Sequence, residues 1–128
     1  MTSKIFFTLS FLFSFTFFAQ AQKIVQVTSN QVSSLLEKNK KWIVLDVRTP
    51  AEFKEGHIKN AINIDINADD SHQKIDKLNK KARYIVHCRS NHRSGVAVEY
   101  MNKQGFKTIY QMSDGYTGWS ANNKPIEK

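Results

Sequence analysis

Short apolar runs, set apart by segments with helical spacing, constrain the fold of this 128-residue chain most strongly. Residues 42–47 (WIVLDV), 84–87 (YIVH) and 108–111 (TIYQ) are such runs. Nearly continuous apolar runs of this length are typical of strands that are covered on both faces of a sheet. Residues 24–27 predict a further strand at an edge, and residues 61–66 (AINIDI) alternate as a strand does.

Helical segments are predicted between these runs. Ser29 is expected to cap a first helix, because Val32, Leu35 and Leu36 then share one buried face. The other predicted helical segments are residues 51–54 after Pro50, residues 69–80 with Ile75 and Leu78 inward, residues 94–104 with Val96, Ala97, Tyr100 and Met101 on one side, and a last turn or helix through Trp119. Gly105 is expected to end the fourth helix. Alternating strands and helices predict an α/β domain with a central, mainly parallel sheet and helices on both faces.

The N-terminal segment has the pattern of a secretory signal peptide. Lys4 precedes an apolar run at residues 5–18, and Ala19-Gln20-Ala21 follows as a cleavage site. The run is shorter than the roughly 20 residues of a membrane-spanning helix. We therefore predict a signal peptide at 1–21 and a folded domain at 22–128, exported to the periplasm or the outside. An uncleaved anchor or a buried N-terminal strand are the alternatives, and Gln22 at the new N-terminus argues against a lipid anchor.

The chain is basic, with a formal net charge of +8. Its lysines are spread along the sequence, and no basic stripe is interleaved with aromatic residues. Together with export, this spread argues against a nucleic-acid partner. We expect a solvated basic surface that at most favours small anions.

The single cysteine, Cys88, lies in the segment VHCRSNHRSG at 86–95. One cysteine cannot form an internal disulfide, so in an exported protein it is either paired with another chain or chemically useful. It follows a predicted strand and precedes a predicted helix, which is where parallel sheets bind ligands. A helix N-terminus and nearby arginines favour the thiolate, and inward N–H groups of a tight loop bind anions.

The loop sequence therefore predicts a nucleophile, Cys88, that attacks a bound sulfur or phosphorus oxyanion. The competing interpretation is a small buried side chain at the end of a strand. The polar residues that follow Cys88 cannot all be buried, which favours the nucleophile.

Several motifs in sequence order resemble those of the single-domain rhodaneses, a family of sulfurtransferases. They are LDVRTPAEFKEGHIKNAINID (45–65), YIVHCRSNHRSG (84–95), QGFKTIYQM (104–112) and DGYTGW (114–119) with Pro125, and they span nearly the whole mature chain. The resemblance implies a Cys88 persulfide that carries sulfur from a donor such as thiosulfate to an acceptor such as cyanide or a thiol. It implies a backbone cradle made by Arg89, Ser90, Asn91, His92 and Arg93, and neither a metal nor an organic cofactor. The implied partners are small sulfur-containing anions, low-molecular-weight thiols and possible thiol proteins.

The chain departs from the family pattern at positions that are often glycine. Here they are Asn60, Asn91, Asp114 and Asn123, residue types that tolerate the left-handed conformation, so the turns are expected to survive. Asn91 adds a side chain to the loop. His92 is also unusual: it either donates to a leaving sulfite or faces solvent, and we expect solvent because an exposed histidine needs no partner.

Phosphatase or arsenate-reductase activity and non-catalytic binding are the two alternatives to sulfur transfer. Cysteine phosphatases, and relatives of this fold that reduce arsenate, have five residues between the cysteine and the arginine, whereas four separate Cys88 from Arg93. The smaller ring suits a persulfide or the outer sulfur of thiosulfate better than a phosphoryl group. A non-catalytic binding module is the other alternative, and such modules commonly lack the cysteine.

Other polar residues of the motifs are expected to be structural. His87 is predicted to point off one face of the sheet. Asp46, Arg48, Glu52 and His57 could in principle serve acid–base catalysis or bind a metal, but their spacing does not form a compact ligand set. We expect them to brace the strand end against the following helix, since buried charges are paired. Tyr116 and Trp119 are expected to pack under the final turn, with the indole N–H on a backbone carbonyl.

Overall fold

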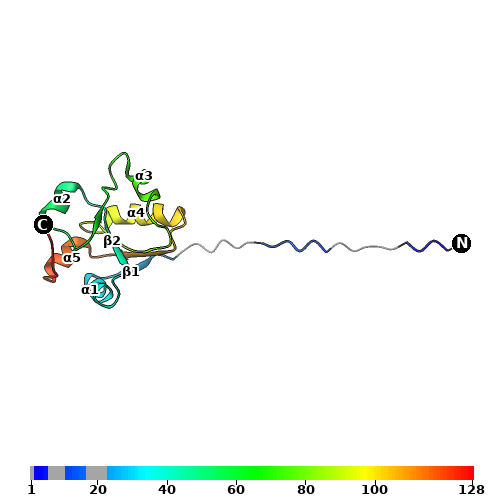
Figure 1. Ribbon diagram of the computed structural model, residues 1–128, viewed down its shortest axis with the longest axis horizontal. Coiled ribbons are helices and arrows are strands. Elements are labelled where there is room, and N and C mark those ends of the chain that lie inside the picture. The colour runs from blue at the N-terminus through cyan, green and yellow to red at the C-terminus, as the bar shows by residue number, and fades with distance from the viewer. Residues whose placement is uncertain (1, 6–10, 17–22) are drawn as a thin grey trace.

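A five-stranded parallel sheet lies at the centre of the structure, a computed structural model that describes residues 2–5, 11–16 and 23–128 (Figure 1). The strands are β1 (Val25–Val27), β2 (Trp42–Asp46), β3 (Ile62–Asn63), β4 (Arg83–His87) and β5 (Thr108–Met112). Their order across the sheet is β1-β5-β4-β2-β3, so β4 is central and β1 is an edge. The predicted parallel α/β architecture and the edge position of the first strand are confirmed.

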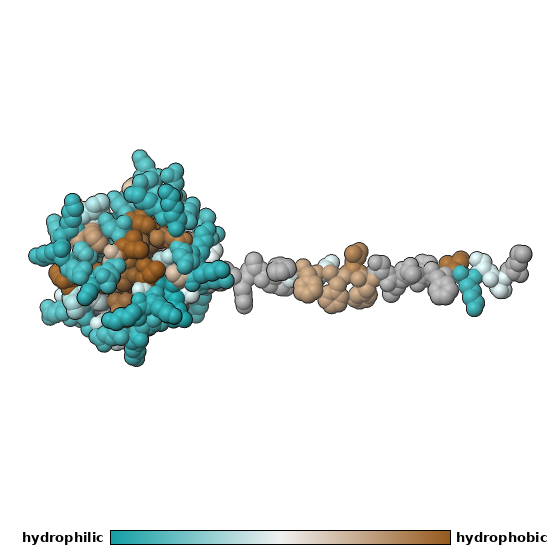
Figure 2. Space-filling view, in the orientation of Figure 1, coloured by the Kyte–Doolittle hydropathy of each residue, from teal (hydrophilic) through white to brown (hydrophobic). Residues whose placement is uncertain are grey.

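Helices cover both faces of this sheet (Figure 1). They are α1 (Ser29–Lys38), α2 (Pro50–Glu55), α3 (Ser71–Asp76), α4 (His92–Lys103) and α5 (Gly115–Ala121). One apolar cluster joins Val44 and Ile85 of the sheet to Val32 of α1 and Trp119 of α5. The cluster on the opposite face lies against α3 and α4, and its main members are Leu45, Ile75, Tyr84, Val86, Ala97 and Met101. Hydrophilic side chains cover most of the domain face that Figure 2 shows, around a central apolar area.

Side-chain alternation along β4 decides which groups reach which face. Tyr84 and Val86 pack toward α3 and α4, whereas Ile85 packs toward α1 and α5. The same alternation sends His87 toward α5 and Cys88, one residue later, toward α4. The two neighbouring residues therefore belong to different layers of the molecule.

Several element boundaries differ from the sequence-based prediction. Thr28, not Ser29, caps α1: its hydroxyl accepts from the Gln31 N–H at 3.3 Å, and the Gln31 side chain accepts from the Thr28 N–H at 2.8 Å. This reciprocal capping fixes the first turn and places Ser29 inside the helix. Ser29 instead donates to the Asp114 carboxylate, from its N–H at 2.8 Å and from its hydroxyl at 2.6 Å.

The α4 helix begins at His92, two residues before the predicted start, and Val96 is not on its buried face. Val96 is 48% exposed, whereas the buried residues are Ser94, Ala97, Val98 and Met101. These follow the spacing i, i+3, i+4 and i+7 of one helix face, and Val96 lies outside it. Gly105 follows the C-cap with φ +84°, as its predicted role requires.

Strand β3 and helix α3 are shorter than predicted, whereas α2 is longer. β3 has only two residues, and the Asn63 side chain donates to the backbone carbonyls of Asp46 and Arg48. Helix α3 spans Ser71–Asp76 rather than 69–80. Ile75 is nevertheless fully buried there, as predicted.

Part of the predicted signal peptide lies outside the described residues, namely positions 1, 6–10 and 17–21. The described residues 2–5 and 11–16 form neither helix nor strand, and Phe11 and Leu12 are 81% and 90% exposed. Within the described ranges, no helix is long and apolar enough to cross a membrane.

Candidate active site

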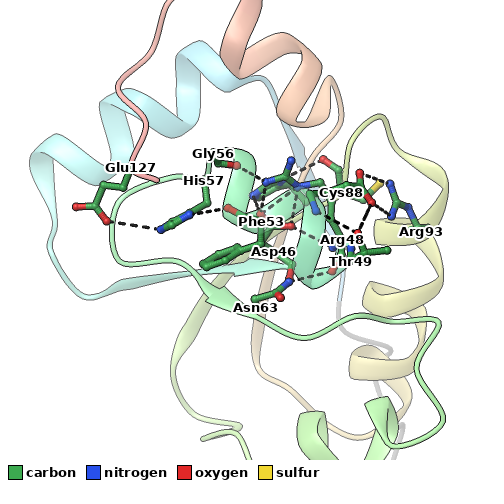
Figure 3. A network of polar contacts seen from close by, with 12 residues as sticks. Asp46, Arg48, Thr49, Phe53, Gly56, His57, Asn63, Cys88, Arg93 and Glu127 are labelled. Atoms are coloured by element: carbon green, nitrogen blue, oxygen red, sulfur yellow. Dashed lines mark hydrogen bonds and ion pairs between the residues drawn. The ribbon is translucent and has the colours of Figure 1, made fainter.

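Cys88 follows the carboxyl end of the central strand β4 and precedes α4. Residues 88–93, here called the Cys88 loop, connect the two elements at the edge of the sheet where parallel strands present their ligand-binding ends. Figure 3 shows Cys88 close to the polar side chains that come from β2 and α2. The predicted position of the nucleophile between strand and helix thus matches the structure.

The Cys88 side chain itself is buried, with 1% of the residue exposed. It packs in the apolar cluster that contains Val86 and Ala97, and its sulfur donates to the Ser94 hydroxyl at 3.6 Å. Burial is the feature that the alternative interpretation of Cys88 expected. It also means that only a small or narrow reactant can approach the sulfur, through the loop.

Carbonyl groups of the Cys88 loop are held away from the loop interior by α5. The Tyr116 N–H donates to the Cys88 carbonyl at 2.8 Å, and the Thr117 N–H donates to the Arg89 carbonyl at 3.0 Å. Gly115 makes this contact possible, because a Cβ there would overlap the Arg89 and Ser90 carbonyls and the residue has φ +59°. The helix end therefore fixes the loop backbone from outside.

Backbone N–H groups of the loop remain free for a ligand. In the described part of the chain, none of the N–H groups from Arg89 to Arg93 donates to another protein atom. Successive N–H donors at the start of a helix form an anion-binding site. Arg89, Ser90, Asn91 and His92 are exposed, and His92 faces solvent as expected.

The Asn91 side chain, on an exposed residue, is bound by Gln111 of β5. Gln111 Nε2 donates to Asn91 Oδ1 at 2.8 Å, to the Asn91 carbonyl at 3.2 Å and to Ser94 Oγ at 2.9 Å. Ser94 Oγ also donates to the Asn91 carbonyl at 2.9 Å. Asn91 has φ −152° and Asp114 has φ −87°, so neither position uses the left-handed conformation that these residue types tolerate.

The left-handed conformation is confirmed at the other two positions. Asn60 has φ 63° and Asn123 has φ 51°. Both occupy turns that a glycine would also fit. The asparagines at these positions therefore have two different structural solutions, a left-handed turn at Asn60 and Asn123 and a side chain bound to Gln111 at Asn91.

Arg93 does not face the loop with a free guanidinium, because Glu52 of α2 binds it. The two nitrogens donate to Glu52 Oε1 at 2.7 Å and Oε2 at 3.0 Å. These hydrogen bonds lower the Glu52 pKa to about 2 and raise the Arg93 pKa, to which the nearby Cys88 also contributes. Thr49 and Glu52 form a capping box at the start of α2, which orients the carboxylate.

A second polar cluster lies behind the loop, on the α5 side of the sheet (Figure 3). Arg48 donates to Asp46 Oδ2 at 2.7 Å and to the Gly56 carbonyl at 2.8 Å, and its guanidinium lies 3.9 Å from the centre of the Tyr116 ring. His87 is fully buried, with Nδ1 3.0 Å from the Cys88 carbonyl and Nε2 3.6 Å from Asp46. Burial lowers the His87 pKa, which favours the neutral ring, and a proton on Nδ1 of that ring would be donated to the Cys88 carbonyl.

The four charged residues expected to form one brace fall into three groups. Asp46 and Arg48 form the buried pair, Glu52 binds Arg93, and His57 stacks on Phe53 and lies 3.7 Å from Glu127. Within residues 2–5, 11–16 and 23–128, no cluster of His, Cys, Asp and Glu is arranged to hold a metal ion. Trp119 donates to the Pro125 carbonyl at 2.9 Å, as predicted.

Sequence reasoning missed Gln111, Ser94 and Gly115 as residues that shape the loop. The sequence predicts that Gln111 lies in a strand, and the one hint of its role in the loop is a long polar side chain next to the buried Met112. Gly115 follows Asp114 at a predicted turn, so its close approach to the loop could not be inferred from local sequence.

The fold and the site together define a parallel α/β domain with its single cysteine at the base of a loop whose N–H groups have no protein acceptor in the described residues. Residues 28–122 match the sequence profile of the Rhodanese-like domain, and the chain belongs to that family.

Relatives of known name are similar over most of the chain. This chain is 30% identical to Rhodanese-like domain-containing protein 17 of Arabidopsis thaliana, and the aligned region covers 82% of this chain and 74% of the relative. It is 26% identical to the thiosulfate sulfurtransferase GlpE of Vibrio cholerae, covering 80% and 94%. The crystal structure of a rhodanese-related protein from Thermoplasma volcanium superposes with a TM-score of 0.69 at 30% identity, covering 80% and 97%. The rhodanese fold and the sulfurtransferase relatives support sulfur transfer as the general activity.

Proposed function

We propose that this protein transfers sulfane sulfur from thiosulfate, or a similar donor, through a persulfide on Cys88. The observation that carries the proposal is a single cysteine at the base of a loop whose five N–H groups, from Arg89 to Arg93, are free of protein acceptors in the described residues. Such a loop stabilises the anions that this chemistry forms.

The reaction has two displacement steps. The Cys88 thiolate attacks the outer sulfur of thiosulfate, a bond forms between Sγ and that sulfur, and sulfite leaves with the electron pair of the broken S–S bond. An acceptor anion, cyanide or a thiolate, then attacks the outer sulfur of the persulfide. Thiocyanate or an acceptor persulfide leaves, and Cys88 returns as a thiolate.

Phosphoryl or arsenate chemistry is a weaker candidate for this site. The loop has four residues before Arg93, and two donors of that arginine are occupied by Glu52. A phosphoryl transition state requires stabilisation of its three equatorial oxygens. A loop that is one residue short and an arginine bound elsewhere both favour the smaller sulfane sulfur.

The experiment compares residues 22–128 with the Cys88→Ser variant. Thiocyanate formation from thiosulfate and cyanide is measured beside the hydrolysis of an aryl phosphate. We expect thiocyanate only, its complete loss in the variant, and a mass increase of about 32 Da on thiosulfate-treated wild-type protein. Phosphate release without thiocyanate formation would replace this proposal with a phosphatase. The absence of product in both assays, together with the absence of a mass increase, would favour a binding module.

Export to the periplasm or the outside is part of the proposal. It rests on Lys4, the apolar run at 5–18 and the small residues Ala19 and Ala21. The intact mass of protein recovered from an exporting host tests it. A chain that begins at Gln22 supports cleavage, and one that retains residues 1–21 contradicts it.

A further inference from the structure

The Cys88 carbonyl has two hydrogen-bonding neighbours, and only one of them belongs to the backbone. The Tyr116 N–H donates to this carbonyl at 2.8 Å, and Nδ1 of the His87 ring lies 3.0 Å from it. His87 is fully buried and takes no part in the two displacement steps. Its ring therefore contacts the peptide unit that follows the nucleophile without contacting a reacting atom.

The surroundings of the two ring nitrogens of His87 indicate which of them carries the proton. Nδ1 is within hydrogen-bond distance of the Cys88 carbonyl, which can only accept. Nε2 has no hydrogen-bond partner among the described residues, and it lies 3.6 Å from Asp46 Oδ2. Arg48 already pairs with that carboxylate through hydrogen bonds of 2.7 Å and 3.0 Å. A neutral ring with its proton on Nδ1 therefore satisfies the carbonyl and leaves no unpaired N–H at Nε2.

The peptide unit between Cys88 and Arg89 transmits this contact to the loop. The unit is planar and trans, so its carbonyl and its N–H point in opposite directions. The carbonyl points toward His87 and α5, and the Arg89 N–H therefore points toward the α4 layer, which holds the Cys88 side chain. The Thr117 N–H turns the next unit in the same way, because it holds the Arg89 carbonyl. No protein atom in the described residues accepts from the Arg89 N–H, so it is available to a bound anion.

We propose that His87 is a positioning residue for sulfur transfer. Its Nδ1–H fixes the Cys88 carbonyl, and this holds the Arg89 N–H toward the anion bound at the loop. A hydrogen bond to the carbonyl also polarises the peptide unit and makes its N–H a stronger donor. The proposal rests on the proposed function and adds a residue to it. Negative charge moves from the Cys88 sulfur to sulfite in the first step, and the loop donors stabilise that charge, whereas His87 exchanges no proton in either step.

The test compares His87→Asn with His87→Leu, two side chains of nearly the same shape. The asparagine amide nitrogen can take the place of Nδ1 and donate to the Cys88 carbonyl, whereas leucine has no donor. We expect kcat/KM for thiosulfate to fall about 10-fold in His87→Leu, less than the 10²-fold or more that loss of a whole oxyanion donor costs. His87→Asn should recover most of that loss. Equal losses in the two variants, or no loss in either, would overturn the proposal.

His57 offers matched controls, because its Nδ1 lies 2.8 Å from the Phe53 carbonyl, a contact of the same kind outside the Cys88 loop. His57→Asn and His57→Leu should leave kcat/KM for thiosulfate unchanged, even if His57→Leu lowers stability. A fall in His57→Leu as large as that in His87→Leu would mean that general destabilisation causes both, and the assignment would be wrong.

Two NMR measurements test the proposal without any change at His87, so they apply even if the His87 variants do not fold. The chemical shifts of the ring nitrogens report where the proton lies. We expect it on Nδ1, and a proton on Nε2 alone would overturn the proposal.

The second measurement titrates the Cys88→Ser variant with thiosulfate, which binds there without reacting. We expect the Arg89 amide resonance to shift. No shift would refute the role of the Arg89 N–H even if the wild-type protein forms thiocyanate. A shift, together with a proton on Nδ1, in a protein that forms no persulfide would refute sulfur transfer and retain the positioning role of His87.

Discussion

At the scale of single residues, the Cys88 loop depends on the side-chain amide of Gln111, which takes no part in the proposed sulfur transfer. Gln111 Nε2 lies within hydrogen-bond distance of three acceptors, which are Asn91 Oδ1, the Asn91 carbonyl and Ser94 Oγ. Gln111 and Ser94 are buried, so water does not easily replace the hydrogen bond between them, whereas Asn91 is exposed. Ser94 in turn accepts the hydrogen bond from Cys88. Gln111 thus positions the Cys88 sulfur through one intermediate, Ser94.

We expect Gln111→Leu to reduce stability by about 1–3 kcal/mol, the cost of leaving buried acceptors unsatisfied. Thiocyanate turnover should also fall, with a higher KM for thiosulfate, since the loop N–H groups lose their fixed orientation. Denaturant unfolding and steady-state kinetics measure the two effects. Gln73→Leu on the exposed side of α3 is the control and should change neither.

A double variant tests whether Gln111 acts through Asn91. If it does, Asn91→Gly in the Gln111→Leu background costs less stability than the same change in the wild type. Strictly additive losses would show that the two side chains act independently and would contradict the clamp.

The site was partly predictable from sequence because some of its signals are local. Three consecutive features carry these signals, namely the apolar run at 84–87, the cysteine after it and the polar loop. The structure has them in the predicted order of strand, cysteine and loop before a helix. The Gln111 contacts join residues 20 and 17 positions apart, so only the packing of β5 beside β4 reveals them. Likewise, Asn91 resembled a left-handed turn residue in the sequence because its distant partner was unknown.

At the scale of elements, a single carboxylate joins the start of α2 to the start of α4. Glu52 Oε1 accepts from the Thr49 N–H and hydroxyl, which cap α2, and also from Arg93 of α4. Helix α2 has only six residues and would be marginal alone. The cap and the ion pair therefore support each other, and together they position the residue that ends the Cys88 loop.

Glu52→Gln is expected to lower stability at neutral pH by about 1 kcal/mol, because the pair is partly exposed. The Glu52 pKa falls from 4.5 to about 2 on folding, so its contribution is complete above pH 4.5 and is lost as the pH falls toward 2. The gap between wild type and variant should narrow over that window. Urea unfolding at intervals from pH 7 to 3 measures it.

The control for this prediction is Glu99→Gln, which breaks an ion pair with Lys103 on an exposed face. It should produce a much smaller gap at neutral pH and leave thiocyanate formation unchanged. A gap for Glu52→Gln that stays constant down to pH 3 would contradict the role of its ionisation.

At the scale of the whole molecule, the sheet separates two polar systems that begin at neighbouring residues. Cys88, Ser94 and Gln111 lie toward α4, whereas His87, Asp46 and Arg48 lie toward α5. Both systems hold the Cys88 loop, the first at Asn91 and the second at the Cys88 carbonyl. The loop is therefore tied to both layers, which explains how so small a domain can keep a row of free N–H groups in place.

Buried His87 should make the stability of the domain depend on pH near neutrality. Burial lowers its pKa below 6.5, although Asp46 opposes the shift and Arg48 adds to it. The unfolded chain then binds a proton near pH 6.5 that the folded protein does not, so stability is complete above pH 6.5 and falls below it. Urea unfolding between pH 8 and 5 should give a slope of up to about 1.4 kcal/mol per pH unit below pH 6.5. His87→Gln should flatten that slope. The control, His72→Gln on the exposed surface of α3, should leave it unchanged. Equal slopes in all three proteins would mean that His87 is protonated in the fold and paired with Asp46.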